Sequence, residues 1–256
     1  MQYVLITNRD SLLSFIKNKA KIYCEKNSYA HIYCREKKIK HFIYTTKKSI
    51  SKIIVSNKNN RIIFNGLKFV IPHNLIKLCK YKIINLHPSI LPNYKGQFPI
   101  NNMFSTKEKF IGATIHEVSA NKDSGKILSQ LRVNKPKNIW VIELYHILFN
   151  IELLLFKNFL NNKIKKYHVK KKKIKFFYKK NIYNFNELKK IDLSNISSYC
   201  VPKKFVKILL NKKVYQILHI EKSNVKMLNN FKKYKFLSQN HLLIKNKNNY
   251  FKAIVI

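Results

Sequence analysis

Glycine, acidic residues and long apolar stretches are all scarce in this chain of 256 residues. It contains 4 glycines, and 11 Asp and Glu stand against 52 Lys and Arg, which gives a formal net charge of +41. This balance excludes an acidic disordered tail. Hydrophobic residues still make up 46% of the chain, with 17 Phe and 15 Tyr, so we expect a folded protein with one large domain, or one domain and a small module.

Cysteine is also rare, and its spacing excludes two kinds of site. The four cysteines form no C-x-x-C pair and have no histidine at zinc-finger spacing, so we expect reduced thiols, no redox pair and no metal ion. They are Cys24, Cys34, Cys79 and Cys200.

No stretch of the sequence predicts a membrane span. The longest apolar run, ILFNIELLLF, contains Asn150 and Glu152 and covers about half of a bilayer. The opening segment YVLIT is too short for the apolar core of a signal peptide. We therefore expect a soluble, cytoplasmic protein.

The positive charge has two readings. Lysine, asparagine and isoleucine crowd the whole chain, so part of the charge reflects a compositional bias. A cationic surface nevertheless attracts polyanions, because binding them releases counterions. The charge therefore predicts RNA or another phosphate-rich partner, and repulsion between copies favours a monomer.

The first part of the chain alternates between apolar runs and helical patterns. YVLIT is typical of a buried strand, and SLLSFIKNK after it has apolar residues at helical spacing. We expect further strands at HFIYTT, KIIVS, RIIFN and KIINL, and a short helix in IPHNLIKLCK. A long amphipathic helix is expected from Trp140 to Phe159. This order predicts an α/β fold.

The second part changes in character. Residues 166–182 are strongly basic with little acidic relief and are expected to form a linker. Beyond them come five short strand patterns, KFVKILLN, KVYQILHIE, KYKFLS, HLLIKN and YFKAIVI, separated by Asn- and Lys-rich turns. They predict a small all-β domain over residues 183–256.

Two segments, INLHPSILPNYKG and IGATIHEVSANKDSGKILSQ, hold three of the four glycines, where a glycine-poor chain keeps them for positive φ or close backbone approach. Asn85 and His87 stand two apart at the end of a predicted strand. Both side chains therefore point to one face, at the edge where open α/β sheets bind ligands. Asp123, in the loop NKDSG, can reach back to the imidazole, orient it and raise its pKa. His116 lies inside a strand pattern and is expected to be a satisfied structural histidine.

These residues together resemble the formyltransferase family that uses 10-formyltetrahydrofolate, in which the Asn-x-His pair, the SILPNYKG segment and the DSG loop have the same order and spacing. The resemblance implies a Rossmann-like catalytic domain over residues 1–165, in which an amine attacks the formyl carbon. It also implies that Asn85 and protonated His87 stabilise the oxyanion, while Asp123 supports His87 and helps to move the amine proton. This chemistry requires no metal ion.

The resemblance further implies contacts for both substrates. The folate pocket of such enzymes is built largely from backbone groups, and it maps onto FNGLKFVI and the Asp loop. The folate-binding candidates are Phe64, Gly66, Leu67, Phe69, Ile71, Ser119, Lys122 and Gly125. The acceptor-binding candidates are Ser89, Leu91, Pro92, Lys95, Gly96, Lys170, Lys171, Lys172 and Lys173. For the four consecutive lysines, the alternative is a solvated charged strand without RNA contact.

The residues after the predicted catalytic domain help to distinguish the possible amine acceptors. A family member that formylates glycinamide ribonucleotide would stop near the end of the long helix. The remainder resembles the linker and small β-barrel (OB-like) C-terminal domain of members that formylate initiator methionyl-tRNA for translation initiation, and a basic surface suits an RNA backbone. The alternative is a sugar-nucleotide N-formyltransferase, which acts on an amino-deoxysugar nucleotide. A nucleic-acid-binding module without catalysis is disfavoured, because compositional drift should have erased an unused set of Asn85, His87 and Asp123.

Overall fold

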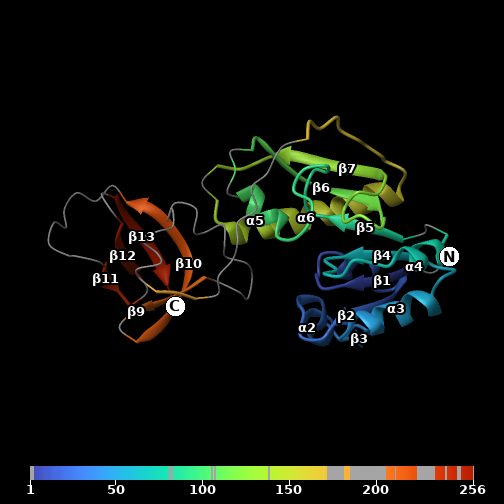
Figure 1. Ribbon diagram of the computed structural model, residues 1–256, viewed down its shortest axis with the longest axis horizontal. Helices are drawn as coiled ribbons and strands as arrows, with labels where there is room; N and C mark the ends of the chain where they lie inside the picture. The colour runs from blue at the N-terminus through green and yellow to red at the C-terminus, as the bar shows by residue number, and fades with distance from the viewer. Residues whose placement is uncertain are drawn as a thin grey trace. The chain divides into compact units, whose positions relative to one another are not determined.

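A computed structural model describes residues 3–80, 83–104, 106, 108–137, 139–171, 182–184, 206–210, 212–223, 234–239, 241–246 and 249–255. The chain divides into two compact units, each with its own sheet (Figure 1). The first unit consists of Met1–Pro99, Glu108–Lys135 and His146–Ile174. The second consists of Ile100–Lys107, Pro136–Tyr145 and Lys175–Ile256.

The first unit is built on a seven-stranded mixed sheet. Its strands are β1 (Tyr3–Thr7), β2 (Ala20–Glu25), β3 (Phe42–Tyr44), β4 (Arg61–Asn65), β5 (Ile83–His87), β6 (Phe110–Glu117) and β7 (Ile127–Asn134), in the spatial order β3-β2-β1-β4-β5-β6-β7. The first five run parallel, and β6 is antiparallel to both β5 and β7. Its helices are α1 (Leu13–Ile16), α2 (Tyr29–Glu36), α3 (Lys47–Ser56), α4 (His73–Leu78) and most of α6 (Val141–Leu160).

The centre of this sheet follows from the apolar runs of the sequence. In β1, Val4, Leu5 and Ile6 are at most 1% exposed, so the strand is buried on both faces, as a parallel strand covered by helices requires. The chain runs from β1 outward to β3 and then returns to β4 on the other side of β1. The boundary between β1 and β4 is therefore the topological switch point, beside which such sheets bind ligands.

Most of the predicted elements are confirmed, and one prediction is wrong. The run KIIVS lies in α3 and not in a strand. The hydroxyl of Thr46 accepts the backbone N–H of Ser49 and caps the helix, and Ile50 and Ile54, one turn apart, are both buried. The β-branched residues favoured a strand, but the cap and the helical spacing of the buried pair decide for the helix. Strand β2 and helix α2 were not predicted, and α1 is shorter than its pattern suggested.

Two glycines let the antiparallel part of the sheet form, as the sequence predicted for close backbone approach. A Cβ on Gly112 would lie 2.0 Å from the carbonyl oxygen of Leu131, and one on Gly125 would lie 1.8 Å from that of Glu117. Neither position tolerates a side chain. Gly125 therefore fixes how the loop after β6, which carries Asp123, returns to β7.

The second unit contains a six-stranded sheet in the order β11-β12-β13-β10-β9-β8. Its strands are β8 (Ile182–Asn184), β9 (Val206–Leu210), β10 (Lys213–Ser223), β11 (Tyr234–Ser238), β12 (His241–Asn246) and β13 (Asn249–Val255). Neighbours pair antiparallel except β8 and β9, which are parallel. All five strands predicted for this part of the sequence are confirmed as β9 to β13.

The core of the second unit shows the alternation expected of a sheet with one buried face. Phe251, Ala253 and Val255 of β13 are buried at every second position and pack with Ile208 and Leu242. Helix α5 (Pro99–Phe104) contributes Phe104, and the start of α6 contributes Val141 and Tyr145. None of the helices in the described ranges is both long and apolar enough to span a bilayer.

Candidate active site

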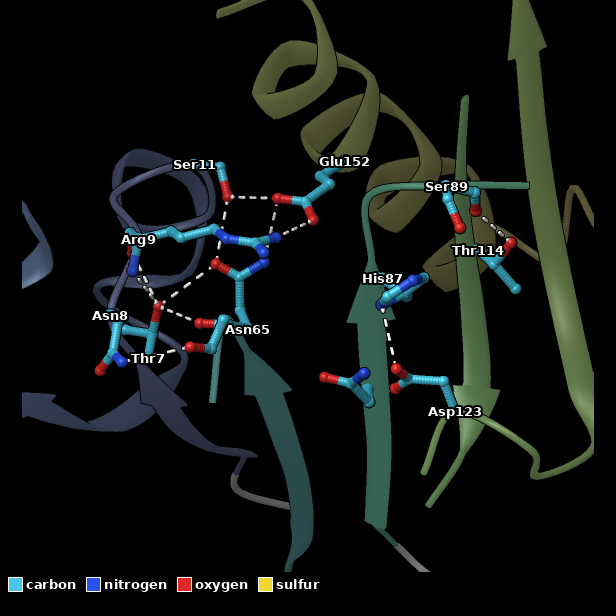
Figure 2. A network of polar contacts seen from close by, with 12 residues as sticks. Thr7, Asn8, Arg9, Ser11, Asn65, His87, Ser89, Thr114, Asp123 and Glu152 are labelled. Atoms are coloured by element: carbon cyan, nitrogen blue, oxygen red, sulfur yellow. Dashed lines mark hydrogen bonds and ion pairs between the residues drawn. The ribbon is translucent and has the colours of Figure 1, made fainter. Parts of the chain in front are cut away.

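The predicted catalytic residues meet at the carboxyl end of β5, close to the switch point of the first sheet. His87 is the last residue of this strand, and Asn85 lies two positions earlier. Asp123 comes from the loop between β6 and β7 and is 38 positions beyond Asn85 in the sequence (123 − 85). The structure brings the carboxylate to the imidazole, with 3.6 Å between Asp123 Oδ2 and His87 Nδ1 (Figure 2).

The hydrogen bonds of His87 define its protonation. The ring is 4% exposed, and its Nε2 lies 2.8 Å from the carbonyl oxygen of Tyr94. A carbonyl only accepts, so Nε2 carries the proton and donates it, which leaves the lone pair of Nδ1 facing Asp123. Burial lowers the pKa of His87 to about 4, although Asp123 and the bond to Tyr94 act in the opposite direction.

Two expectations for His87 can be compared with these contacts. The sequence predicted that Asp123 raises the pKa of His87, and Asp123 does act in that direction, but the loss of solvent around the ring outweighs it. The resemblance implied a protonated ring during transfer, whereas burial favours the neutral ring in the free protein. In the resting site, a lone pair and a carboxylate therefore face each other across 3.6 Å.

His116 also belongs to this cluster, although the sequence indicated only a structural role. It lies directly opposite Asn85 in the antiparallel pairing of β5 and β6. Its Nε2 is 3.0 Å from Asn85 Nδ2 and 3.6 Å from Asp123 Oδ1, and its Nδ1 is 2.8 Å from the carbonyl oxygen of Glu117. Burial lowers the pKa of His116. The alternating pattern of β6 placed His116 in a strand, but only the register against β5 places it beside Asn85.

The loop after β5 holds the Asp123 carboxylate from the other side. The backbone N–H of Gly96 donates to Asp123 Oδ2 at 2.8 Å, and Lys95 Nζ donates to the hydroxyl of Ser124 at 2.7 Å. Asp123 has a φ of +47°, a left-handed conformation that few residues other than Gly, Asn and Asp adopt readily. The carboxylate is thus fixed by its backbone as well as by its partners.

An open cavity of about 420 Å³, counting space shared with solvent, adjoins this cluster. Its walls include Asn85, His116 and Asp123, whereas His87 is not part of the wall. Six of the eight folate-binding candidates line the cavity, and Gly66 and Gly125 do not. The six are Phe64, Leu67, Phe69, Ile71, Ser119 and Lys122. Val70, also in the wall, lies within the predicted segment FNGLKFVI but was not a named candidate, and Val118 was not predicted.

The acceptor-binding candidates of the loop after β5 divide into two groups. Ser89 and Leu91 are buried, and their polar groups are occupied: the Ser89 hydroxyl donates to the carbonyl of Asn93, and the N–H of Leu91 donates to Thr114. Pro92, Lys95 and Gly96 are partly exposed. The structure therefore assigns the buried pair to the shape of the loop and leaves the other three accessible.

The basic segment after α6 docks along β7 as far as the structure describes it. Gln130 binds it twice, through its backbone N–H to the carbonyl of Lys165 at 2.7 Å and through its side-chain oxygen to the N–H of Tyr167 at 3.0 Å. Asn93 Nδ2 donates to the carbonyl of Lys170 at 3.1 Å. The side chains of Lys170 and Lys171 are exposed. The other two lysine candidates, at positions 172 and 173, lie outside the described residues.

A second buried polar cluster lies at the switch point itself, where β1 and β4 end (Figure 2). Glu152 of α6 is fully buried and accepts hydrogen bonds from Arg9, Ser11 and Asn65. The Arg9 guanidinium also stacks over the Phe149 ring at 5.4 Å. A Cβ on Gly66 would lie 3.0 Å from the Arg9 side chain, so Gly66 belongs to this cluster and not to the cavity wall.

Within the described part of the chain, no group of three or more His, Cys, Asp and Glu side chains could hold a metal ion.

Comparison with known proteins gives these residues a context. Residues 14–138 match the family model described as formyl transferase. A methionyl-tRNA formyltransferase of Orientia tsutsugamushi is 30% identical over 96 residues, which cover 38% of this chain and 31% of that protein. A GDP-perosamine N-formyltransferase of Brucella melitensis is 33% identical over 85 residues, or 33% of each chain. These alignments span about a third of the length of the curated relatives.

A solved structure matches the whole chain. It is an N-formyltransferase of Helicobacter canadensis, in complex with folinic acid and dTDP-3-aminofucose, which matches with a TM-score of 0.63 and 17% identity over 100% of both chains. At this identity the likeness concerns the fold alone. It agrees with the Rossmann-like α/β sheet of the first unit.

Proposed function

We propose that the protein, whose residues 14–138 match the family model described as formyl transferase, transfers a formyl group from 10-formyltetrahydrofolate to a primary amine. One observation carries this proposal. Asn85, His87 and Asp123 come together in the fold, and Asn85 and Asp123 line the cavity. Their donors and acceptors are those that acyl transfer to an amine needs.

The cavity fits the formyl donor in shape and chemistry. Phe64, Leu67 and Ile71 offer apolar surface to a flat aromatic ring system such as a pterin. Asn85, His116 and Asp123 add polar groups to the same wall. A folate bound in this cavity would place its apolar ring against the apolar side chains and its formyl group near Asn85 and Asp123.

The residues then divide the chemistry between them. The amine nitrogen attacks the formyl carbon, and the negative charge that develops on the formyl oxygen is stabilised by an N–H of Asn85. His87 Nδ1 and Asp123 together accept the proton that the amine loses, since a proton placed between them replaces the repulsion of two acceptors by a hydrogen bond. The same proton then passes to the nitrogen of the departing tetrahydrofolate as the carbon–nitrogen bond breaks.

For the acceptor, we propose initiator methionyl-tRNA, and hence a role in translation initiation in the cytoplasm. The docked basic segment supports this choice, because Lys170 is hydrogen-bonded through its backbone to Asn93 in the loop that follows the catalytic strand. The exposed residues Lys170 and Lys171 are thus tied to the loop that also carries Lys95 and Gly96, and their positive charge suits an RNA backbone.

The domain plan belongs to the same proposal. We propose a catalytic domain over residues 1–165, a basic linker over 166–182 and an OB-like barrel over 183–256, acting as a monomer. The β-rich second unit, with its core on one face of the sheet, supports a small domain of this kind.

A sugar-nucleotide N-formyltransferase is the second candidate. It is favoured by the alignment with the Brucella melitensis protein and by the solved Helicobacter canadensis structure, which covers the chain from end to end. In this alternative the catalytic residues keep their roles, and the acceptor is an amino-deoxysugar nucleotide.

A formyl-transfer assay separates the two candidates. Labelled 10-formyltetrahydrofolate is supplied in parallel with charged initiator methionyl-tRNA and with a panel of nucleotide-linked 3-amino and 4-amino sugars. We expect label in acid-precipitable tRNA. Label in a sugar nucleotide alone would favour the second candidate, and transfer to no acceptor would contradict both.

The exposed lysines offer a matched test of RNA contact. Lys170→Ser combined with Lys171→Ser should weaken tRNA binding and reduce the slope of log affinity against log salt by about 1 to 2. Lys47→Ser with Lys48→Ser removes the same charge from two exposed residues at the start of α3 and serves as the control. Equal salt slopes for the two double variants would exclude a specific role for the docked segment.

A further inference from the structure

Three consecutive hydrogen-bonding groups determine how the Asn85 side chain is turned. His116 Nδ1 lies 2.8 Å from the carbonyl oxygen of Glu117, which can only accept, so Nδ1 carries a proton. On a neutral ring the other nitrogen, Nε2, is then an acceptor. It lies 3.0 Å from Asn85 Nδ2, which donates to it. The amide therefore presents its NH₂ group to His116 and its oxygen to the opposite side.

The surroundings of His116 keep this arrangement in place. The ring is 2% exposed, and the backbone pairing of β5 with β6 sets Asn85 directly opposite it. The other charged or titratable groups that face the ring are Asp123, His87 and Lys95. Asp123 favours a protonated ring, but burial and Lys95 lower the pKa of His116, so the ring is neutral at physiological pH.

The orientation has a consequence for catalysis, because an amide can stabilise an oxyanion only through its N–H groups. An Asn85 amide turned by 180° would present its oxygen to His116 and would need a second proton on that ring. With the observed orientation, one N–H of Asn85 is held by His116, which leaves the second N–H of the same NH₂ group to donate elsewhere on a residue that lines the cavity.

We propose that His116 is a positioning residue, which holds the Asn85 amide so that its second N–H donates to the formyl oxygen during transfer. This inference rests on the proposed formyl transfer and adds to it a residue that touches neither substrate in that role. The contacts that carry it are those of His116 with Glu117 and with Asn85.

Two substitutions separate positioning from a merely structural role. His116→Gln retains an acceptor near the position of Nε2 but loses the donor to Glu117, whereas His116→Asn retains a donor near Nδ1 and loses the acceptor for Asn85. We expect kcat to fall about tenfold or more in His116→Asn and only a few-fold in His116→Gln, with KM for the formyl donor within about twofold of the wild type in both. If anchoring of the strand were the whole role, His116→Asn would be the more active variant, and that order would overturn the proposal.

A double-mutant cycle tests whether the effect passes through Asn85. In an Asn85→Ala background the amide is gone, so adding His116→Asn should change kcat by less than about twofold. If His116→Asn lowered kcat as much in this background as in the wild type, the residue would act by another route. Thermal unfolding of each variant shows whether it is folded at the assay temperature.

One further measurement is independent of turnover. Long-range proton–nitrogen correlation spectra of the wild-type protein report which nitrogen of each histidine carries the proton, and we expect the Nδ1–H form for His116 at neutral pH. The Nε2–H form would overturn the positioning role. A wild-type protein that shows the Nδ1–H form but formylates no acceptor would instead contradict the proposed function.

Discussion

Two buried polar clusters lie at the carboxyl ends of strands in the first sheet, one at the switch point between β1 and β4 and the other beside β5, and they differ in how well their members are paired. In the Arg9 cluster, the Glu152 carboxylate is met by donors from Arg9, Ser11 and Asn65. In the Asp123 cluster, the carboxylate accepts from Gly96 but also faces the lone pairs of His87 and His116, each at 3.6 Å. Both carboxylates are largely shielded from solvent, so the contrast does not come from exposure.

This difference in pairing suggests that the Arg9 cluster stabilises the fold and that the Asp123 cluster serves the proposed chemistry. A fully paired buried network rigidifies the fold, and losing one member leaves another without a partner. A cluster that brings acceptors together is poorer in hydrogen bonds, but it has affinity for one more proton. The Asp123 cluster is also the one that borders the cavity. Its incomplete pairing is what a site that moves a proton requires.

The largest expected effect comes from completing the pairing of the Asp123 cluster. In Asp123→Asn, the new amide can donate to His87 or His116, and Asn tolerates the left-handed backbone at this position. We expect kcat to fall about 10³-fold, since the proton acceptor is lost, while the melting temperature stays the same or rises. Steady-state kinetics and calorimetry on the same preparation check both parts.

Two results would contradict the assignment of Asp123 to the chemistry rather than to stability. An Asp123→Asn variant with near-normal turnover would remove Asp123 from the chemistry. A variant that loses turnover because it melts many degrees earlier would make Asp123 a structural residue instead.

The second largest effect should come from breaking the pairing of the Arg9 cluster. Glu152→Gln leaves the Arg9 guanidinium without its counter-charge, and we expect a loss of about 3 kcal/mol in the free energy of unfolding, with turnover at low temperature within a few-fold of normal. Urea denaturation measures the loss. The control is Glu25→Gln, because the ion pair of Glu25 with Lys68, whose side chain is 61% exposed, should contribute under about 1 kcal/mol. Equal losses in the two variants would refute the distinction.

The sequence predicted one of these clusters and not the other, for physical reasons. Asn85 and His87 share a face because strand side chains alternate, which is a local rule. Arg9 and Glu152 are 143 positions apart, and each alone has the pattern of an ordinary surface charge or of a helix residue. No local periodicity joins them, because only the topology of the sheet and the packing of α6 bring them together.

The same limit explains the other differences. The strand pattern around His116 could be recognised, but its partner Asn85 follows from the register between β5 and β6, which is tertiary information. The run KIIVS has strand-like residues, and the capping of α3 by Thr46 outweighed that preference. The five C-terminal strands were predictable because alternation and turn residues, both local signals, define them.

The dependence on pH offers the third test of the contrast, because only the Asp123 cluster contains titrating histidines. In the proposed mechanism the neutral form of His87 accepts the proton, and burial lowers its pKa to about 4. The ring should therefore stay neutral as the pH falls through 6.5, so any loss of activity in that range comes from protonation of the acceptor amine and not of His87. An NMR titration of the His87 ring in the free protein from about pH 3.5 to 8 measures the midpoint, and a midpoint near 6.5 would contradict the neutral resting state.

The same shift makes a prediction for stability, with a definite sign. A histidine whose pKa is lowered by folding contributes stability above its unfolded pKa of about 6.5, and this contribution is lost as the pH falls toward the folded value of about 4. His87→Gln cannot titrate. As the pH falls through that range, the free energy of unfolding of the wild type should decrease relative to that of His87→Gln. Urea denaturation at each pH measures both values.

The smallest expected effects come from two glycines, one beside each cluster, whose backbones have the same left-handed conformation. A Cβ on Gly66 (φ +83°) would lie 3.0 Å from the Arg9 side chain, whereas a Cβ on Gly96 (φ +91°) would meet nothing within 4 Å. The N–H of Gly96 donates to Asp123. Gly96→Ala should cost about 1 kcal/mol from φ alone, and Gly66→Ala about 2 kcal/mol, because Arg9 must also move. Denaturation curves give both values.

The kinetics of the two alanine variants should rank in the opposite order. A small shift of the Gly96 backbone moves the donor that holds Asp123, so Gly96→Ala should lower kcat several-fold more than Gly66→Ala, despite its smaller cost in stability. Gly66→Ala should thus lose more unfolding free energy and Gly96→Ala more kcat, and this opposite order is a stricter test than either effect alone. If stability and kcat ranked the two variants in the same order, the two clusters would form one network, and the separation between a structural cluster and a catalytic one would not hold.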